Sequence, residues 1–103
     1  MLKETYLSNL KNLPPGVRRV RVCRPSILAP SAELLALWKN GKLTWEGYVE
    51  QFRLELLARK GAYARMAEIA KSARDGDVYL YCYERDNTHC HRSILLEIIG
   101  GMG

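Results

Sequence analysis

The feature that most constrains the fold is a nearly continuous apolar run near the end of the chain, at Asp77–Glu84. It reads Asp-Val-Tyr-Leu-Tyr-Cys-Tyr-Glu. A run of this kind is typical of a central strand covered on both faces, since a strand with one wet face alternates apolar and polar residues. Isoleucines and leucines then recur at helical spacing from about Cys90 onward. The end of the chain therefore predicts a strand, a polar turn and a helix.

A second strand is predicted at Val17–Cys23, where valines alternate with arginines. One wet face places this strand toward an edge of the sheet, and the alternation puts Cys23 on the arginine side. Upstream, Thr5–Leu13 is predicted as a first strand that bends into a loop, closed by Pro14-Pro15-Gly16.

Three helices are expected between the second and third strands: Ala32–Lys39 with Ser31 as N-cap, Trp45–Lys60 with Thr44 as N-cap, and Ala62–Arg74. In the third helix, Tyr63, Met66, Ile69 and Ala73 are expected to face inward. Strands separated by helices indicate an α/β fold. We therefore predict a small, mainly parallel sheet flanked by helices, with residues 1–103 forming one compact layered domain.

Hydropathy, cysteine content and charge indicate where the protein is located and which partners it can have. No apolar run reaches the roughly 20 residues that span a bilayer, and three cysteines are an odd number that makes no disulfide framework. A cytoplasmic location without membrane contact is expected. The net charge of +5 invites a nucleic-acid partner. A strand edge guarded by charge is favoured over that partner, because no aromatic residues are interleaved with the basic cluster at Arg18–Arg24.

The strand–turn–helix unit at Tyr79–Arg92 is where we expect the chemistry. The start of a helix has unpaired N–H groups and a partial positive charge, both of which favour an anion. Arg92 adds a cation, which is itself unfavourable in the first helical turn unless an anion or an acid such as Glu84 compensates it. If the strands are parallel neighbours, Arg24 at the end of the second strand reaches the same crevice. Arg24 and Arg92 are the predicted anion ligands.

The candidates for catalysis are Cys90, a histidine beside it and Glu84. Cys90 is a candidate nucleophile, since a helix N-terminus and nearby cations lower the pKa of a thiol, with His89 or His91 as its base. Glu84 is a candidate general acid or base, or an orienting partner of Arg92. A structural cysteine and a structural salt bridge are the alternatives.

A metal site is not favoured by this pattern. Cys82, His89, Cys90 and His91 are residue types that bind Zn²⁺. There is no C-x₂-C pair, however, and the three adjacent residues 89–91 can hardly all turn toward one ion. Neither a metal nor a cofactor is expected.

The residues Cys82-Tyr-Glu84 and His89-Cys-His-Arg92 resemble the C-terminal motif of the family known as domain of unknown function 488. Its pattern is Cys-x-Glu, a short loop, Cys-His-Arg and a helix. The segments Asn9–Pro14 and Leu28–Ser31 are similar to its Asn-Leu-Lys-Lys-Leu-Pro and Leu-Ala-Pro-Ser stretches, and Arg24 stands where an arginine follows the second strand. The resemblance covers nearly the whole chain and implies a compact α/β protein of prokaryotic cytosol, with no established reaction.

One departure from the family pattern bears on the site. Relatives carry a longer Pro/Lys-rich loop between that arginine and Leu-Ala-Pro-Ser, which Arg24-Pro-Ser-Ile27 shortens here. The resemblance thus implies a more open crevice in this chain. Three functions stay open: a binding or catalytic pocket for an anionic small molecule, phosphate or nucleotide; a nucleic-acid-binding or processing module; and a non-catalytic interaction protein.

Overall fold

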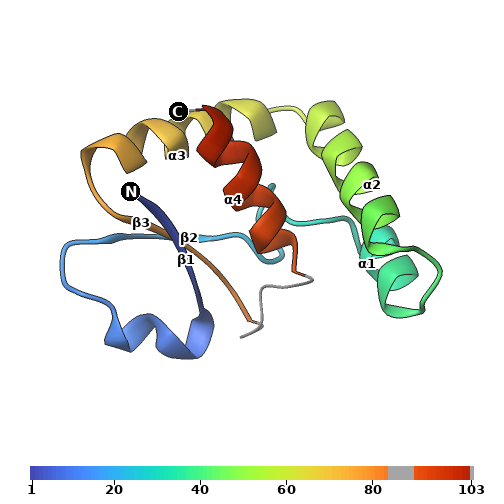
Figure 1. The fold of residues 1–103 in the computed structure, drawn as a ribbon, viewed down its shortest axis with the longest axis horizontal. Coiled ribbons are helices and arrows are strands. Elements are labelled where there is room, and N and C mark those ends of the chain that lie inside the picture. Colours follow the sequence, from blue (N-terminus) through green and yellow to red (C-terminus); the bar gives the residue numbers. More distant parts are fainter. Residues whose placement is uncertain (84–89, 103) are drawn as a thin grey trace.

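The fold is built around β3 (Val78–Cys82), the middle strand of a three-stranded sheet in the order β1-β3-β2 (Figure 1). The computed structural model describes residues 1–83 and 90–102. β1 (Leu2–Tyr6) and β2 (Arg18–Arg21) both run parallel to β3. The parallel sheet flanked by helices and the central position of the apolar run are confirmed. β1 begins earlier than predicted.

The remaining elements are η1 (Leu7–Asn12, a 3-10 helix), α1 (Ala32–Lys39), α2 (Trp45–Ala58), α3 (Ala62–Asp75) and α4 (His91–Met102). The predicted N-caps are confirmed, since the Ser31 and Thr44 side chains accept hydrogen bonds from the backbone N–H groups of Leu34 and Gly47. Gly61 separates α2 from α3 with a φ of 86°, a left-handed conformation that glycine adopts without steric cost. The segment predicted to loop after the first strand is helical in η1.

The two faces of the central strand differ in burial. Val78, Leu80 and Cys82 are buried on one face, whereas Tyr79 and Tyr81 on the other are only half-buried. The expectation that the apolar run is covered on both faces was therefore wrong. Tyrosine explains the difference, because its ring packs on neighbours while its hydroxyl reaches water, so a tyrosine face reads as apolar in a sequence without being fully enclosed.

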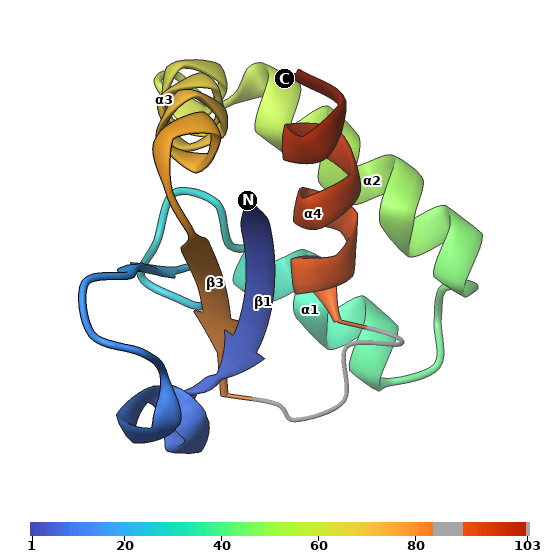
Figure 2. The ribbon, with the colours of Figure 1, turned by 60° about the vertical axis from the view of Figure 1, so that its left-hand side comes forward.

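Helices α3 and α4 pack over the sheet (Figure 2). Two ion pairs join this layer to the strands: Glu68 of α3 pairs with Arg18 of β2, and Arg92 of α4 pairs with Glu4 of β1. In α3, Met66 and Ile69 are buried as predicted, but Tyr63 is 68% exposed. Its inward orientation was wrongly predicted, because Ala62, with no exposed surface, occupies the buried position at the start of the helix.

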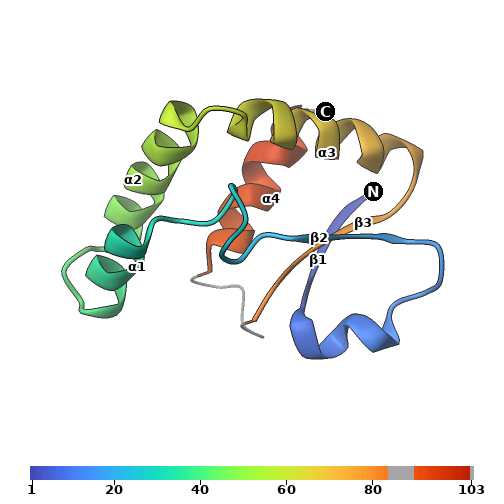
Figure 3. The ribbon, with the colours of Figure 1, turned by 180° about the vertical axis from the view of Figure 1, so that it is seen from behind.

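Helices α1 and α2 lie to one side of the sheet, reached by the chain that leaves β2, as the view from behind also shows (Figure 3). Their mutual packing is aromatic: the rings of Trp38, Trp45 and Tyr48 have centroids 5.3–5.6 Å apart. None of the helices within 1–83 and 90–102 combines the length and apolar character of a bilayer-crossing segment.

Candidate functional site

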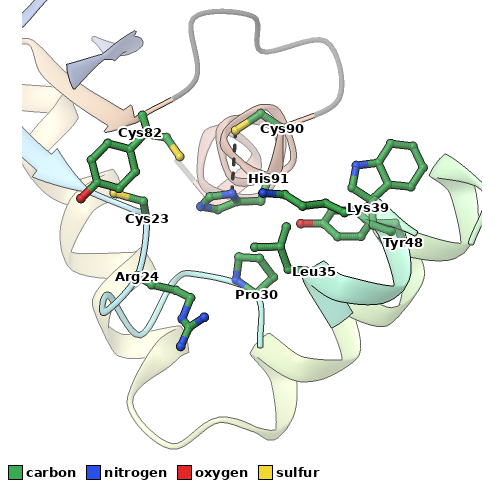
Figure 4. A pocket seen from close by; sticks show the side chains of 11 residues that line it. Cys23, Arg24, Pro30, Leu35, Lys39, Tyr48, Cys82, Cys90 and His91 are labelled. Atoms are coloured by element: carbon green, nitrogen blue, oxygen red, sulfur yellow. Dashed lines mark hydrogen bonds between the residues drawn. The ribbon is translucent and has the colours of Figure 1, made fainter. Parts of the chain in front are cut away.

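A cavity of about 300 Å³ lies at the carboxyl ends of β2 and β3, between α1, α2 and the start of α4 (Figure 4). This is the edge at which ligands bind in open α/β folds, and the volume is at the lower end for small-molecule sites. The described residues that line it are Cys23, Arg24, Pro30, Leu35, Trp38, Lys39, Tyr48, Cys82, Tyr83, Cys90 and His91.

The segment after β2 brings Cys23 and Arg24 to the cavity. The ladder with β3 reaches Arg21, and the Val22 N–H still donates to the Tyr81 carbonyl oxygen at 3.0 Å. The strand then gives way to a loop, so the alternation does not extend to Cys23, which is buried instead of lying on the exposed arginine side as predicted. Arg24 is exposed at the cavity, next to the ends of both strands.

Arg21 holds two parts of the cavity rim together. Its guanidinium donates to the Arg24 carbonyl oxygen at 2.7 Å and to the Tyr83 hydroxyl at 2.6 Å, and it lies over the Tyr83 ring. These bonds connect the chain after β2 to the chain after β3. Arg21 therefore positions the backbone from which Arg24 extends.

His91 is the first residue of α4 and lies in the wall of the cavity. Its Nε2 is 2.6 Å from the Val22 carbonyl oxygen, and its ring meets Phe52 edge-on with centroids 5.7 Å apart. A carbonyl oxygen only accepts, so Nε2 carries the hydrogen and, in the neutral ring, Nδ1 has a lone pair. Nδ1 faces the Cys90 sulfur at 3.8 Å.

Cys90 precedes α4 and is buried beside Cys82. Its hydrogen bond with Cys82 and its burial hold the pKa of the Cys90 thiol above the usual value. The sequence had predicted the opposite direction from the helix N-terminus. Desolvation and a second thiol outweigh that field, because both favour the uncharged form. The pKa of Cys23 is also raised, chiefly by burial.

Arg92 has no exposed surface and extends toward β1. Its Nε lies 2.8 Å from a Glu4 carboxylate oxygen, and another guanidinium nitrogen donates to the Thr5 carbonyl oxygen at 2.6 Å. An acid thus compensates the cation in the first turn of α4, as the helix dipole requires. Arg92 is not among the residues that line the cavity.

Two of the predicted residues, Glu84 and His89, lie outside the described residues. The described candidates Arg24, Cys90 and His91 come together at the cavity, and Arg92 lies behind it.

Three charged or aromatic lining residues were not predicted from the sequence: Trp38 and Lys39 at the end of α1 and Tyr48 in α2. Trp38 and Tyr48 belong to the aromatic cluster of α1 and α2, which helical spacing alone marks as core. Lys39 looks like an ordinary basic residue in the last turn of a helix. A signal was present in the short connection at Arg24–Ser31, which keeps α1 near the end of β2.

The described part of the cavity wall carries positively charged side chains and no negatively charged ones. Arg24 and Lys39 supply two cations, and no acidic residue is among the described lining residues. Trp38, Tyr48 and Tyr83 add aromatic surface, and the wall has both apolar and polar parts. Such a wall suits a ligand that carries a negative charge next to a flat or apolar group.

Comparison with known families gives one match. Residues 5–103 match the family described as the active DUF488-N3 subclade, DUF488-N3a. No curated protein and no solved structure shows a significant match. Because the matched region spans nearly the whole chain and includes every described residue that lines the cavity, this protein belongs to the DUF488 family.

Proposed function

We propose that the cavity binds a small anionic ligand of the phosphate or nucleotide class. The observation that carries the proposal is that Arg24 and Lys39 both line a cavity whose described wall has no acidic residue. Arg24 suits a phosphate group because its guanidinium presents a planar fork of N–H donors, and Lys39 adds a point charge. Trp38 is the surface on which a base or another flat group would rest, and the buried Tyr48 ring packs against it with centroids 5.6 Å apart.

Arg92 has a different part in this proposal from the one that the sequence suggested. Its guanidinium is engaged with Glu4 and Thr5, so we assign it the positioning of the α4 N-terminus behind the cavity. Direct anion binding is assigned to Arg24 and Lys39.

Catalysis by Cys90, His91 and Glu84 stays a prediction. The 3.8 Å approach of the Cys90 sulfur to His91 Nδ1 favours proton transfer between them. The raised pKa of Cys90 counts against a resting thiolate. We therefore propose ligand binding and no reaction. The prokaryotic cytoplasm is the expected location of the protein.

The test is ligand binding by calorimetry, with inorganic phosphate, AMP and ADP as probes. We expect the double variant Arg24→Ala/Lys39→Ala to weaken binding at least about 30-fold, because two charge-assisted contacts are lost. The matched control is Lys60→Ala/Lys71→Ala, which removes the same charge from exposed positions outside the cavity wall. Equal losses in both variants would mean that only net charge matters, and absence of binding to all three probes would remove the proposal.

A further inference from the structure

Three soft or borderline metal-binding groups converge at the inner end of the cavity (Figure 4). Cys82 ends β3, Cys90 precedes α4 and His91 begins α4, and their donor atoms all lie within 4.8 Å of one another. All three side chains are buried. The cluster joins β3 and α4, two elements that are consecutive in the described part of the chain.

From the sequence, zinc was not favoured because the adjacent residues 89–91 can hardly all turn toward one ion. The structure removes this objection for Cys90 and His91. Cys90 stands before the first helical residue while His91 begins the helix, and their donor atoms Sγ and Nδ1 face each other at 3.8 Å. A Zn²⁺ ion in tetrahedral coordination holds a sulfur and a nitrogen about 3.6 Å apart, and two sulfurs about 3.8 Å apart. Small side-chain rotations therefore bring all three donors to ligand distance.

His91 is oriented in the manner of a metal ligand. Its Nε2–H donates to the Val22 carbonyl oxygen at 2.6 Å, which places the Nδ1 lone pair on the side of the Cys90 sulfur, 3.8 Å away. Metal-binding histidines almost always donate their second ring N–H to a carbonyl or carboxylate in this way, because the bond fixes both the tautomer and the ring plane. The edge-on contact with Phe52 further restricts the ring.

We infer that Cys82, Cys90 and His91 form a site for Zn²⁺, with two thiolates and one imidazole as ligands. Both thiols give up their protons to solvent on binding, because the thiolate is the form that ligates a metal. Since all three residues also line the cavity, the fourth coordination position faces the cavity and is filled by water or by a ligand oxygen. Three protein ligands and one exchangeable position are typical of catalytic zinc sites, whereas structural zinc sites have four protein ligands.

This inference is independent of the proposed function. The metal ligands are Cys82, Cys90 and His91, whereas anion binding is assigned to Arg24 and Lys39. The double variant Arg24→Ala/Lys39→Ala is expected to keep its affinity for Zn²⁺ within about threefold.

The test is titration of the fully reduced, chelator-treated protein with Zn²⁺ in competition with a chromogenic chelator. We expect one equivalent to bind, and Cys82→Ser, Cys90→Ser and His91→Gln each to weaken binding at least about 100-fold. Cys23→Ser is the matched control, because Cys23 is a buried cysteine of the same cavity that is not in the three-residue cluster, and it should change affinity less than about threefold.

A second measurement on the unmodified protein guards against variants that fail to fold. Co²⁺ in place of Zn²⁺ should give a thiolate-to-metal charge-transfer band with the intensity of two thiolates. Nitrogen NMR of His91 should show the metal on Nδ1 with the hydrogen kept on Nε2. Absence of the thiolate band, metal on Nε2, or a loss in Cys23→Ser equal to that in Cys82→Ser would each overturn the site.

Discussion

For Arg92, the sequence predicts that its charge must be compensated but not which residue compensates it. A cation in the first turn of a helix requires compensation, and that requirement is readable from sequence. The compensating acid described by the structure is Glu4, at the opposite end of the chain. Because the guanidinium has no exposed surface, removing it leaves a cavity and a carboxylate without this cation.

We expect Arg92→Ala to lower the free energy of unfolding by about 2–4 kcal/mol, because a fully buried side chain is removed and the half-buried Glu4 carboxylate loses this cation. The measurement is urea unfolding followed by circular dichroism. Arg53→Ala is the matched control: the Arg53–Glu97 pair is surface-exposed, and its loss should cost less than about 1 kcal/mol. An Arg92→Ala protein that is as stable as the parent but no longer binds phosphate would instead make Arg92 a direct anion ligand.

At the scale of elements, α3 is held to β2 by the Arg18–Glu68 pair, in which both terminal guanidinium nitrogens, Nη1 and Nη2, donate to the carboxylate. The hydrogen bond from Arg18 lowers the pKa of Glu68. A carboxyl group whose pKa is lowered on folding stabilises the folded state above its unfolded pKa, and this contribution is lost as the pH falls through the folded pKa.

Glu68→Gln should therefore destabilise the protein at pH 7. It should have no effect at a pH below the folded pKa of Glu68, where the carboxyl group of the parent is protonated. The difference at pH 7 should be no more than about 1 kcal/mol, because the pair is partly exposed and screened by solvent. Glu97→Gln is the control, since Glu97 is 78% exposed and its contact with Arg53 is 3.4 Å. A difference that grows toward acid pH would contradict the assignment.

Much of the arrangement of elements could be predicted from the sequence, because local rules decide it. Caps such as Ser31 and the alternation in β2 are short-range signals. The position of Arg24 near Cys90 and His91 also followed, because parallel neighbouring strands end at one edge of the sheet. Lys39 and Tyr48 could not be placed, because their approach to the cavity depends on how α1 and α2 pack against the start of α4, which has no short-range signature.

At the scale of the whole molecule, the arginines of β2 form hydrogen bonds and ion pairs within the protein. Arg18 pairs with Glu68, and Arg21 donates to the Arg24 carbonyl oxygen and to Tyr83. Arginines held in this way are less available to phosphates of a nucleic acid. The nucleic-acid alternative therefore stays less favoured than the anion pocket.

A fluorescent single-stranded RNA and a DNA duplex should show no salt-dependent binding between about 0.05 and 0.2 M salt. Nucleic-acid binding through arginine–phosphate contacts would weaken steeply over this range, with a slope set by the number of phosphates contacted. Fluorescence anisotropy is the measurement. A steep slope that Arg19→Ala reduces would favour the nucleic-acid alternative over the proposed function.

The strand order has a consequence for how the protein is made. In the described sheet, β1 and β2 each pair with β3, which follows them by most of the chain. A nascent chain that has not yet exposed β3 can form helices but none of these strand pairs. Contacts between residues so distant in sequence slow folding, because the chain between them must be ordered first. The sheet, and the cavity at its edge, can therefore form only after β3 has been synthesised, when it pairs with β1 on one side and with β2 on the other.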